Sequence, residues 1–366
     1  MKWFRLLLLP FSSLWYVVSR LRTWLYVSGK LSRRSFPLPV FVVGNLSTGG
    51  TGKSPHAELL ARLMLERGYR TAVLSRGYGR STHGFRSVGQ HDAARLTGDE
   101  PLMIKRALPQ ATVAVCEDRA LGIARLAEQH QPDVVVMDDA YQHLRVKASC
   151  YFLLTAFESP FTDDHLLPAG DLRESRHAAA RADCVVVTKV PRRYADDTER
   201  AEEAREKLRR AIARYTDAPV VFSRYDYADC VKNPFTGSLP VDELKECNVL
   251  LVTAVANPIP LLSHLGALEV TCRHLQYPDH HAFTRRDVEK IKNEFLNLPP
   301  GKNIVLTTEK DMARIIGSPL ERLPVYSLAV RAVVLPQDVE AFDRVINKTL
   351  QAYETKKTDK RICSKN

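Results

Sequence analysis

Residues 46–56, LSTGGTGKSPH, contain the groups that bind a nucleotide phosphate. The usual loop reads G-x-x-x-x-G-K-[ST], and alignment on its end places Ser47 where the first glycine would stand. Flexible backbone N–H groups, a helix N-terminus and a lysine together bind phosphate oxygens. A tight strand-to-helix turn is the alternative, but a turn does not require Lys-Ser. The expected nucleotide ligands are Gly49, Gly50, Thr51, Gly52, Lys53 and Ser54, with Lys53 at the β- and γ-phosphates and Ser54 on Mg²⁺.

Two acidic residues end a second apolar run, VVVMDDAYQH (134–143). Asp138 and Asp139 occupy the Walker-B position, from which a carboxylate holds Mg²⁺ directly or through water. The alternative is a charged strand end and turn, but the upstream loop favours metal binding. His143 follows near the same sheet edge, where α/β proteins bind ligands.

Asp99, in LTGDEP (96–101), has two interpretations. It precedes a helix that begins near Pro101, where an acidic side chain commonly caps the backbone N–H groups. It is also a candidate general base that takes a proton from an acceptor hydroxyl. Spacing alone favours the cap.

Polar loops supply further candidates. Their arginines could bind phosphate oxygens, with a solvated surface position as the alternative. One loop carries adjacent histidines, either of which could assist a base, although histidines in polar loops often lie on the surface. These residues are Arg76, Arg80, Arg173, Arg176, His280 and His281.

The candidate residues follow short strands that are apolar throughout and alternate with helical patterns. Such strands indicate a parallel sheet with helices on both faces, here of the P-loop NTPase-like α/β class. The pattern restarts after the charged helix over 196–215, which predicts a second, smaller α/β domain. Two strand-like segments, 219–227 and 324–335, could lead out of the first domain and back beside each other. We therefore expect a membrane-associating helix over 1–28, a kinase domain over 29–222, a smaller domain over 223–335, and a C-terminal helix with a disordered tail over 336–366.

The first 57 residues contain no acidic side chain but include Trp3, Trp15 and Trp24. Tryptophan with arginine suits a membrane–water interface, whereas Arg5 and Pro10 interrupt any spanning helix. A buried amphipathic helix and a cleaved signal peptide are the alternatives, the latter with a poor cleavage region.

Composition narrows the function class. The 366-residue chain has a net charge of +11, which favours anionic partners, and seven scattered cysteines without C-x-x-C, which indicate a reducing compartment. A GTPase would have an N-K-x-D loop, but residues 188–191 read TKVP. We expect no nucleic acid partner and no obligate protein partner. A membrane-recruited ATPase switch stays an alternative to a kinase.

The order of several motifs resembles one family, the tetraacyldisaccharide 4′-kinases of lipid A synthesis. The matching stretches are VGNLSTGGTGKSPH, LSRGYGR, GDEP, DDAYQH, LLPAGDLRE, ANP, YPDHHAFT and TTEKD, within residues 1–335. Ala140 and Tyr141 stand where the family commonly has Gly and Phe, and Asp171 stands where Pro is common.

The resemblance implies two α/β domains joined by a two-stranded linker, with the site in the cleft. It implies ATP- and Mg²⁺-dependent phosphorylation of the 4′-hydroxyl of an acylated glucosamine disaccharide 1-phosphate, at the cytoplasmic face of the bacterial inner membrane, by a monotopic enzyme that also contacts anionic lipid. It makes Asp99 the general base, assisted by His280 or His281. Lys53 and Ser54 then serve the phosphates and metal, and Asp138 and Asp139 serve Mg²⁺. Arg76, Arg80, His143, Arg173 and Glu174 are the expected substrate-binding residues.

Overall fold

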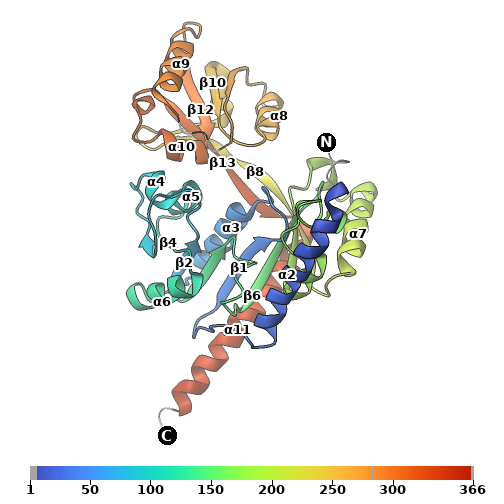
Figure 1. The fold of residues 1–366 in the computed structure, drawn as a ribbon. Coiled ribbons are helices and arrows are strands. Elements are labelled where there is room, and N and C mark those ends of the chain that lie inside the picture. Colours follow the sequence, from blue (N-terminus) through green and yellow to red (C-terminus); the bar gives the residue numbers. More distant parts are fainter. Residues whose placement is uncertain (1–5, 280, 282, 364–366) are drawn as a thin grey trace.

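The computed structural model describes residues 6–279, 281 and 283–363 (Figure 1). Its strands join edge to edge in the order β11-β10-β12-β13-β8-β7-β6-β1-β5-β2-β4-β3, and β9 pairs with β8. Two α/β units lie along this path, a larger one and a smaller one. The expected α/β class is confirmed.

The larger unit has a sheet that is parallel except at β3. Its strands are β1 (Val40–Asn45), β2 (Thr71–Ser75), β3 (Arg86–Ser87), β4 (Thr112–Val115), β5 (Val134–Asp138), β6 (Cys150–Ala156) and β7 (Cys184–Thr188). Its helices are α3 (Lys53–Glu66), α4 (Ala94–Thr97), α5 (Asp99–Ala107), α6 (Arg119–Gln129) and α7 (Glu199–Ala213). The final helix, α11 (Val339–Cys363), also packs on this unit.

Both faces of this sheet are covered, as the apolar strands predict. Val40 and Val42 of β1 belong to a core cluster that includes residues of α6 and α7. The alternate residues, Phe41 and Val43, join a second cluster with α3, α5 and α11. Because successive side chains of a strand point to opposite faces, one continuous apolar run supplies both cores.

The smaller unit has three parallel strands, β10 (Cys247–Thr253), β11 (Cys272–Gln276) and β12 (Lys302–Thr308), and the first half of β13 extends them. Its other elements are β9 (Gly237–Pro240), α8 (Ile259–Ala267), α9 (Arg285–Leu296) and α10 (Glu309–Ile315). Two clusters of its own, one on each face of the strands, form its core.

Two long strands connect the units. β8 (Val220–Asn233) pairs in parallel with β7 at its start, and then antiparallel with β13 (Val325–Val334) from Ser223 to Lys232. The expectation that the outgoing and returning segments lie side by side is thereby confirmed. β8 crosses the expected boundary at residue 223 without interruption, so the exact limits of the domains stay a prediction.

The N-terminal helix lies on the surface. It consists of η1 (Leu6–Leu8) and α2 (Leu9–Val27), and within α2 only Ser12 is buried. The alternative interpretation of this segment as a buried amphipathic helix is therefore wrong. Among the described residues, no helix combines the length and apolarity needed to cross a bilayer. Residues 1–5 of the expected membrane helix lie outside the described residues.

The C-terminal segment is helical. α11 continues through Cys363, and the expected disordered end of the chain stays a prediction. A charged sequence can stay helical because Lys, Arg and Glu have good helix propensity. Residues 364–366 lie outside the described residues.

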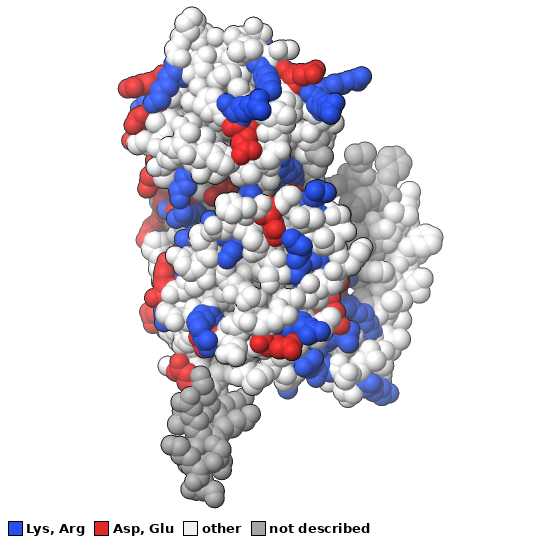
Figure 2. All heavy atoms as spheres, turned by 90° about the vertical axis from the view of Figure 1, so that its left-hand side faces the viewer, with Lys and Arg blue, Asp and Glu red and all other residues white. Residues whose placement is uncertain are grey.

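The net positive charge is not gathered into one patch on the face that Figure 2 displays. There, Lys and Arg are interspersed with Asp and Glu over both units. Interspersed opposite charges neutralise each other locally, because salt screens the interaction between more distant charges.

Candidate active site

The glycine-rich loop joins the end of β1 to the start of α3. Gly49 and Gly52 have positive φ values of 106° and 86°, which glycine adopts without strain. Gly52 is the N-cap of α3, and Lys53 and Ser54 open the first turn. The Lys53 ammonium donates to the Gly49 carbonyl oxygen over 3.3 Å, so it lies across the loop. This is the geometry of a loop that presents N–H groups and a cation to phosphate oxygens.

A strand of the linker packs against this loop. A Cβ placed on Gly52 would lie 2.0 Å from the Tyr225 hydroxyl oxygen, so only glycine fits beside β8. His56 connects the same elements: Nδ1 donates to the Gly52 carbonyl oxygen over 2.7 Å, and Nε2 lies 2.8 Å from the Ser223 hydroxyl. Burial lowers the pKa of His56 to about 4, which keeps the ring neutral and leaves Nε2 as an acceptor.

Asp138, the last residue of β5, is fully buried beside the loop. Its Oδ2 accepts from the Ser54 hydroxyl over 3.2 Å and from the Ser75 hydroxyl over 3.5 Å. Its Oδ1 is buried and has no hydrogen-bond partner in the described structure. Burial, then the charges of Glu100 and Asp139, raises the pKa of Asp138 to about 7, while Lys53 and Ser54 act in the opposite direction.

Asp139 lies on the other side of the lysine. One carboxylate oxygen is 3.9 Å from the Lys53 ammonium and the other is 3.5 Å from Nη1 of Arg173. Its φ of 46° is uncommon for a residue other than glycine, and such backbone strain is concentrated at functional sites. The structure thus brings together Lys53, Ser54 and both expected acids, with Asp138 facing the serine and Asp139 facing the two cations.

Asp99 is not the helix cap that its spacing favours. Gly98 is the N-cap of α5, with a φ of 92°, and Asp99 is the first helical residue. Its carboxylate instead accepts from Arg314 of α10, including a 3.0 Å bond from Nε. The cap interpretation is wrong because Gly98, which also ends α4, occupies the N-cap position.

The histidine pair is only half described. His280 lies outside the described residues. His281 directs Nε2 to Asp287 over 2.9 Å and stacks on Tyr277, at the start of α9. The hydrogen bond from Thr284, and then that from His281, lowers the pKa of Asp287 to about 2. A part for either histidine in assisting Asp99 stays a prediction.

Several expected substrate residues have protein partners instead. The Arg80 side chain is almost fully buried and its Nη2 pairs with Glu117 at 2.5 Å, while Nε and Nη1 have no hydrogen-bond partner in the described structure. Glu174 is buried against Arg181 at 2.8 Å and does not line an open surface. An ionised side chain loses its hydration on burial, so these ion pairs compensate part of its cost. Substrate binding by Arg80 and Glu174 stays a prediction.

The remaining expected residues stay near the sheet edge. His143 accepts from the backbone N–H of Arg119 over 3.2 Å, and burial lowers its pKa to about 4, so the neutral ring helps to hold the start of α6. Arg76 is exposed at the end of β2, and Arg173 is half-buried beside Asp139. Substrate binding by these three residues stays a prediction.

Two cations at the site were missed by sequence reasoning. Lys189, beyond β7, donates from its ammonium to the Gly50 carbonyl oxygen. Its TKVP segment was considered only as a failed GTPase motif, and its position after a buried strand was the signal that could have found it. Arg119 is buried behind β5 and reaches the Asp138 carbonyl oxygen over 3.4 Å. Burial lowers its pKa to about 10, while the charges of Asp138 and Asp139 oppose this shift.

Comparison with known proteins identifies close relatives. The sequence profile of the family described as tetraacyldisaccharide-1-P 4′-kinase matches residues 4–351. The chain is 36% identical over 350 residues to the tetraacyldisaccharide 4′-kinase of Flavobacterium psychrophilum, covering 95% of this chain and 97% of that one. It is 37% identical over 351 residues to the enzyme of that name from Bacteroides thetaiotaomicron, covering 93% and 91%. The crystal structure of LpxK from Aquifex aeolicus in complex with ATP is similar, with a TM-score of 0.75, 28% identity, and coverage of 95% of this chain and 99% of that one.

We predict that Gly52→Ala lowers the midpoint of thermal unfolding measured without nucleotide. A left-handed conformation costs a non-glycine residue about 1–2 kcal/mol, and the new methyl group also meets Tyr225. Adding Tyr225→Phe removes the hydroxyl and should recover part of the loss, but not the part caused by the positive φ.

Gly50→Ala is the matched control. Its new Cβ would have only the Lys189 ammonium nearby, at 3.9 Å, and its φ is not positive, so the midpoint should change little. Equal midpoints for Gly52→Ala and Gly50→Ala would show that β8 does not constrain the loop.

Proposed function

The chain belongs to the tetraacyldisaccharide 4′-kinase family, and on that premise we propose how its own residues carry out the reaction. It is a kinase that transfers the γ-phosphate of ATP to the 4′-hydroxyl of an acylated glucosamine disaccharide 1-phosphate, a lipid A precursor, to give lipid IVA. This activity replaces the alternative of an ATPase switch without an acceptor. The observation that supports the residue assignments most strongly is the convergence of Lys53, Ser54, Asp138 and Asp139 at one sheet edge.

The glycine-rich loop holds the triphosphate in this proposal. The backbone N–H groups at the start of α3 face the phosphate oxygens, and the Lys53 ammonium moves from the Gly49 carbonyl to the β- and γ-phosphates. Lys53 and Arg173, which flank Asp139, then face the charge that develops on the transferred group. Lys189 holds the loop from the side of β7 by its contact with Gly50.

The residues beside the loop fit a magnesium ion. A hydroxyl and a carboxylate, combined with phosphate oxygens and water, are the oxygen ligands that Mg²⁺ prefers. Ser54 and Asp138 provide this pair, and the buried, unpartnered Oδ1 of Asp138 is an acceptor that the protein itself leaves unused in the described structure. When bound, the ion would neutralise negative charge on the β- and γ-phosphate oxygens. Among the described residues, no group of three or more His, Cys, Asp or Glu side chains could hold a metal alone, which agrees with a site completed by the nucleotide.

Asp99 is the general base of this proposal. Its carboxylate takes the proton of the 4′-hydroxyl while that oxygen bonds to the γ-phosphorus and the bond to the β–γ bridging oxygen breaks. ADP leaves with the electrons of the broken bond. A sugar hydroxyl is a weak nucleophile near neutral pH, so a positioned carboxylate accelerates its attack. His280 or His281 would assist this base.

The N-terminal helix attaches the enzyme to the membrane that holds its substrate. Exposed apolar side chains run along α2, among them Leu14, Val17 and Leu21. A contiguous apolar surface of this kind marks an interaction site, and nearby basic residues attract anionic lipid. We assign the enzyme to the cytoplasmic face of the inner membrane, as a monotopic protein.

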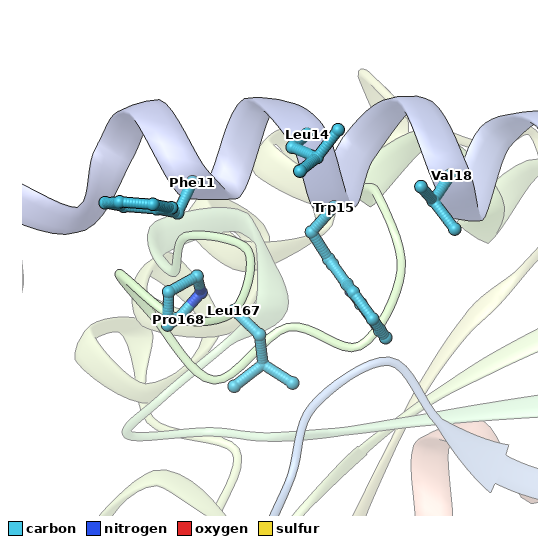
Figure 3. A pocket seen from close by; sticks show the side chains of 6 residues that line it. All are labelled: Phe11, Leu14, Trp15, Val18, Leu167 and Pro168. Atoms are coloured by element: carbon cyan, nitrogen blue, oxygen red, sulfur yellow. The ribbon is translucent and has the colours of Figure 1, made fainter.

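A hollow beside the helix extends this surface into the protein. Phe11 and Trp15 project from α2 toward Leu167 and Pro168 of the loop before Arg173 (Figure 3). The hollow has a volume of about 370 Å³ and an almost wholly apolar lining. The Trp15 indole donates to the Arg173 carbonyl oxygen over 2.9 Å, so the helix also holds the loop that carries a candidate phosphate ligand.

We expect Asp99→Asn to lower kcat about 10²- to 10⁴-fold, the usual contribution of a general base, with little change in the KM for ATP. The measurement is formation of the bisphosphorylated lipid from ATP and the acyl disaccharide 1-phosphate. Glu128→Gln, an exposed acid on α6 of the same unit, is the control and should keep wild-type turnover. Near-wild-type turnover of Asp99→Asn would remove Asp99 as the base.

Titration with MgCl₂ at fixed ATP should separate the two acids after β5. Asp138→Asn should raise the Mg²⁺ concentration required for half-maximal turnover, because that carboxylate faces Ser54. Asp139→Asn should lower kcat with a smaller change in this concentration, because Asp139 faces Lys53 and Arg173. The opposite ranking would make Asp139 the metal ligand.

Replacement of Val17 and Leu21 together by Ser should reduce cosedimentation with vesicles that contain anionic phospholipid. Both side chains are more than half exposed, so thermal unfolding should change little. The double replacement of Ile259 and Leu296 by Ser is the control, because these apolar residues are even more exposed and lie on the smaller unit. Equal vesicle binding by the two variants would exclude α2 as the attachment surface.

A further inference from the structure

Arg314 connects the smaller unit to the candidate base on the larger one. It lies in α10, yet its Nε and Nη2 both donate to Oδ2 of Asp99 in α5. The side chains of Arg314 and Asp99 are only 9% and 17% exposed. A guanidinium held by two bonds in a position this shielded is more strongly constrained than an exposed ion pair.

The Arg314 guanidinium is also held by a residue of its own helix, Asp311. Its Nη1 donates to Oδ1 of Asp311 over 3.3 Å, and Asp311 is completely buried. The other oxygen of Asp311 accepts from the backbone N–H of Ala254 over 2.9 Å and from the Thr308 hydroxyl over 2.8 Å. The ends of β10 and β12 thus hold Asp311, which holds Arg314, which in turn holds Asp99.

Apolar packing accompanies the Asp311–Arg314–Asp99 contacts, which lie at the interface between the two units. Ala313, next to Arg314, belongs to the same core cluster as Leu102 and Ile104 of α5. α10 is therefore packed on the larger unit through a buried methyl group as well as through the ion pair. Any movement of the smaller unit away from α5 would separate Arg314 from Asp99.

We propose that Arg314 is a positioning residue, which orients the Asp99 carboxylate for proton transfer only while the smaller unit is packed against α5. The inference rests on the proposed role of Asp99 as base. Two N–H groups on one oxygen restrict rotation of the carboxyl group, and a general base must lie within hydrogen-bond reach of its proton. A misplacement of the catalytic carboxylate by about 1 Å can lower the rate about 10²-fold. The anchored guanidinium can therefore have a large effect on the rate without contacting the substrate. Through Arg314, the position of the smaller unit determines whether the Asp99 carboxylate is oriented for proton transfer.

A double-mutant cycle between Arg314→Gln and Asp99→Asn tests the proposal in the full-length enzyme. Arg314→Gln should lower kcat by about ten- to a hundredfold, with the KM values for ATP and lipid changed by no more than a few-fold. In the Asp99→Asn background it should cause no further loss, because the group that it orients is already inactive. Arg314→Lys, which keeps the charge and a single donor head, should recover part of the turnover.

Arg273→Gln is the matched control, because Arg273 pairs with Glu294 inside the smaller unit and does not reach the larger one. Its turnover should equal that of the wild type. Thermal unfolding of each variant separates loss of positioning from loss of fold. If Arg314→Gln does not fold, Arg314→Lys carries the same cycle with a smaller expected loss.

Three results would overturn the proposal. Additive losses in the cycle would show that Arg314 acts independently of Asp99, and a rise mainly in the KM for ATP would make it a nucleotide ligand. Unchanged or faster turnover of Arg314→Gln would exclude positioning and, if faster, would show that the ion pair inhibits the base. Failure of the base assignment is recognised separately, because Asp99→Asn alone would then keep near-wild-type turnover.

Discussion

The burial of one carboxylate, that of Asp138, is the constraint on which the rest of the site depends. A fully buried acid has lost its hydration, so its charged form is stable only if neighbouring groups compensate. Ser54 and Ser75 donate to one oxygen, while Lys53 and Arg119 provide opposite charge. These groups come from three different elements, α3, β2 and α6, so the start of α3, the sheet and α6 must all be in place before the acid is accommodated. The compensation remains incomplete at Oδ1, which is the physical argument for a cation at this position.

The smaller unit is connected to the glycine-rich loop as well as to Asp99, the proposed base. β8 brings the Tyr225 hydroxyl against Gly52 and the Ser223 hydroxyl against His56, so the strand that leads to the smaller unit is also a wall of the phosphate loop. A second contact between the units is made by α10, whose Arg314 donates to Asp99. β8 and β13, which pair with each other, therefore connect the elements that contact the phosphate loop and Asp99.

The helix proposed for membrane attachment contacts the loop that carries Arg173. α2 is fixed at its inner side by the Ser12 hydroxyl, which donates to the Leu166 carbonyl oxygen, and by the Trp15 indole on the Arg173 carbonyl oxygen. Arg22 continues the contact with the Gln142 carbonyl oxygen in the loop after Asp139. The helix thus presents apolar side chains outward and holds two catalytic loops inward. If α2 attaches to a bilayer as proposed, these contacts would set the height of the phosphate loop above the lipid surface.

The sequence by itself determined the class of fold, the glycine-rich loop, the two acids at the end of β5 and the apolar, basic character of the N-terminal helix. These features depend on residues close together in the chain: an apolar run, a Gly-Lys-Ser turn, and a tryptophan-rich segment without acids. Only the tertiary structure decided that Arg80 and Glu174 are paired inside the protein, that Gly98 rather than Asp99 caps α5, and that Arg314 meets Asp99 across 215 positions of sequence. The physical reason is that the role of a buried ionised side chain depends on its partner. Tertiary packing, such as that of α10 on α5, selects this partner, and local spacing in the sequence does not.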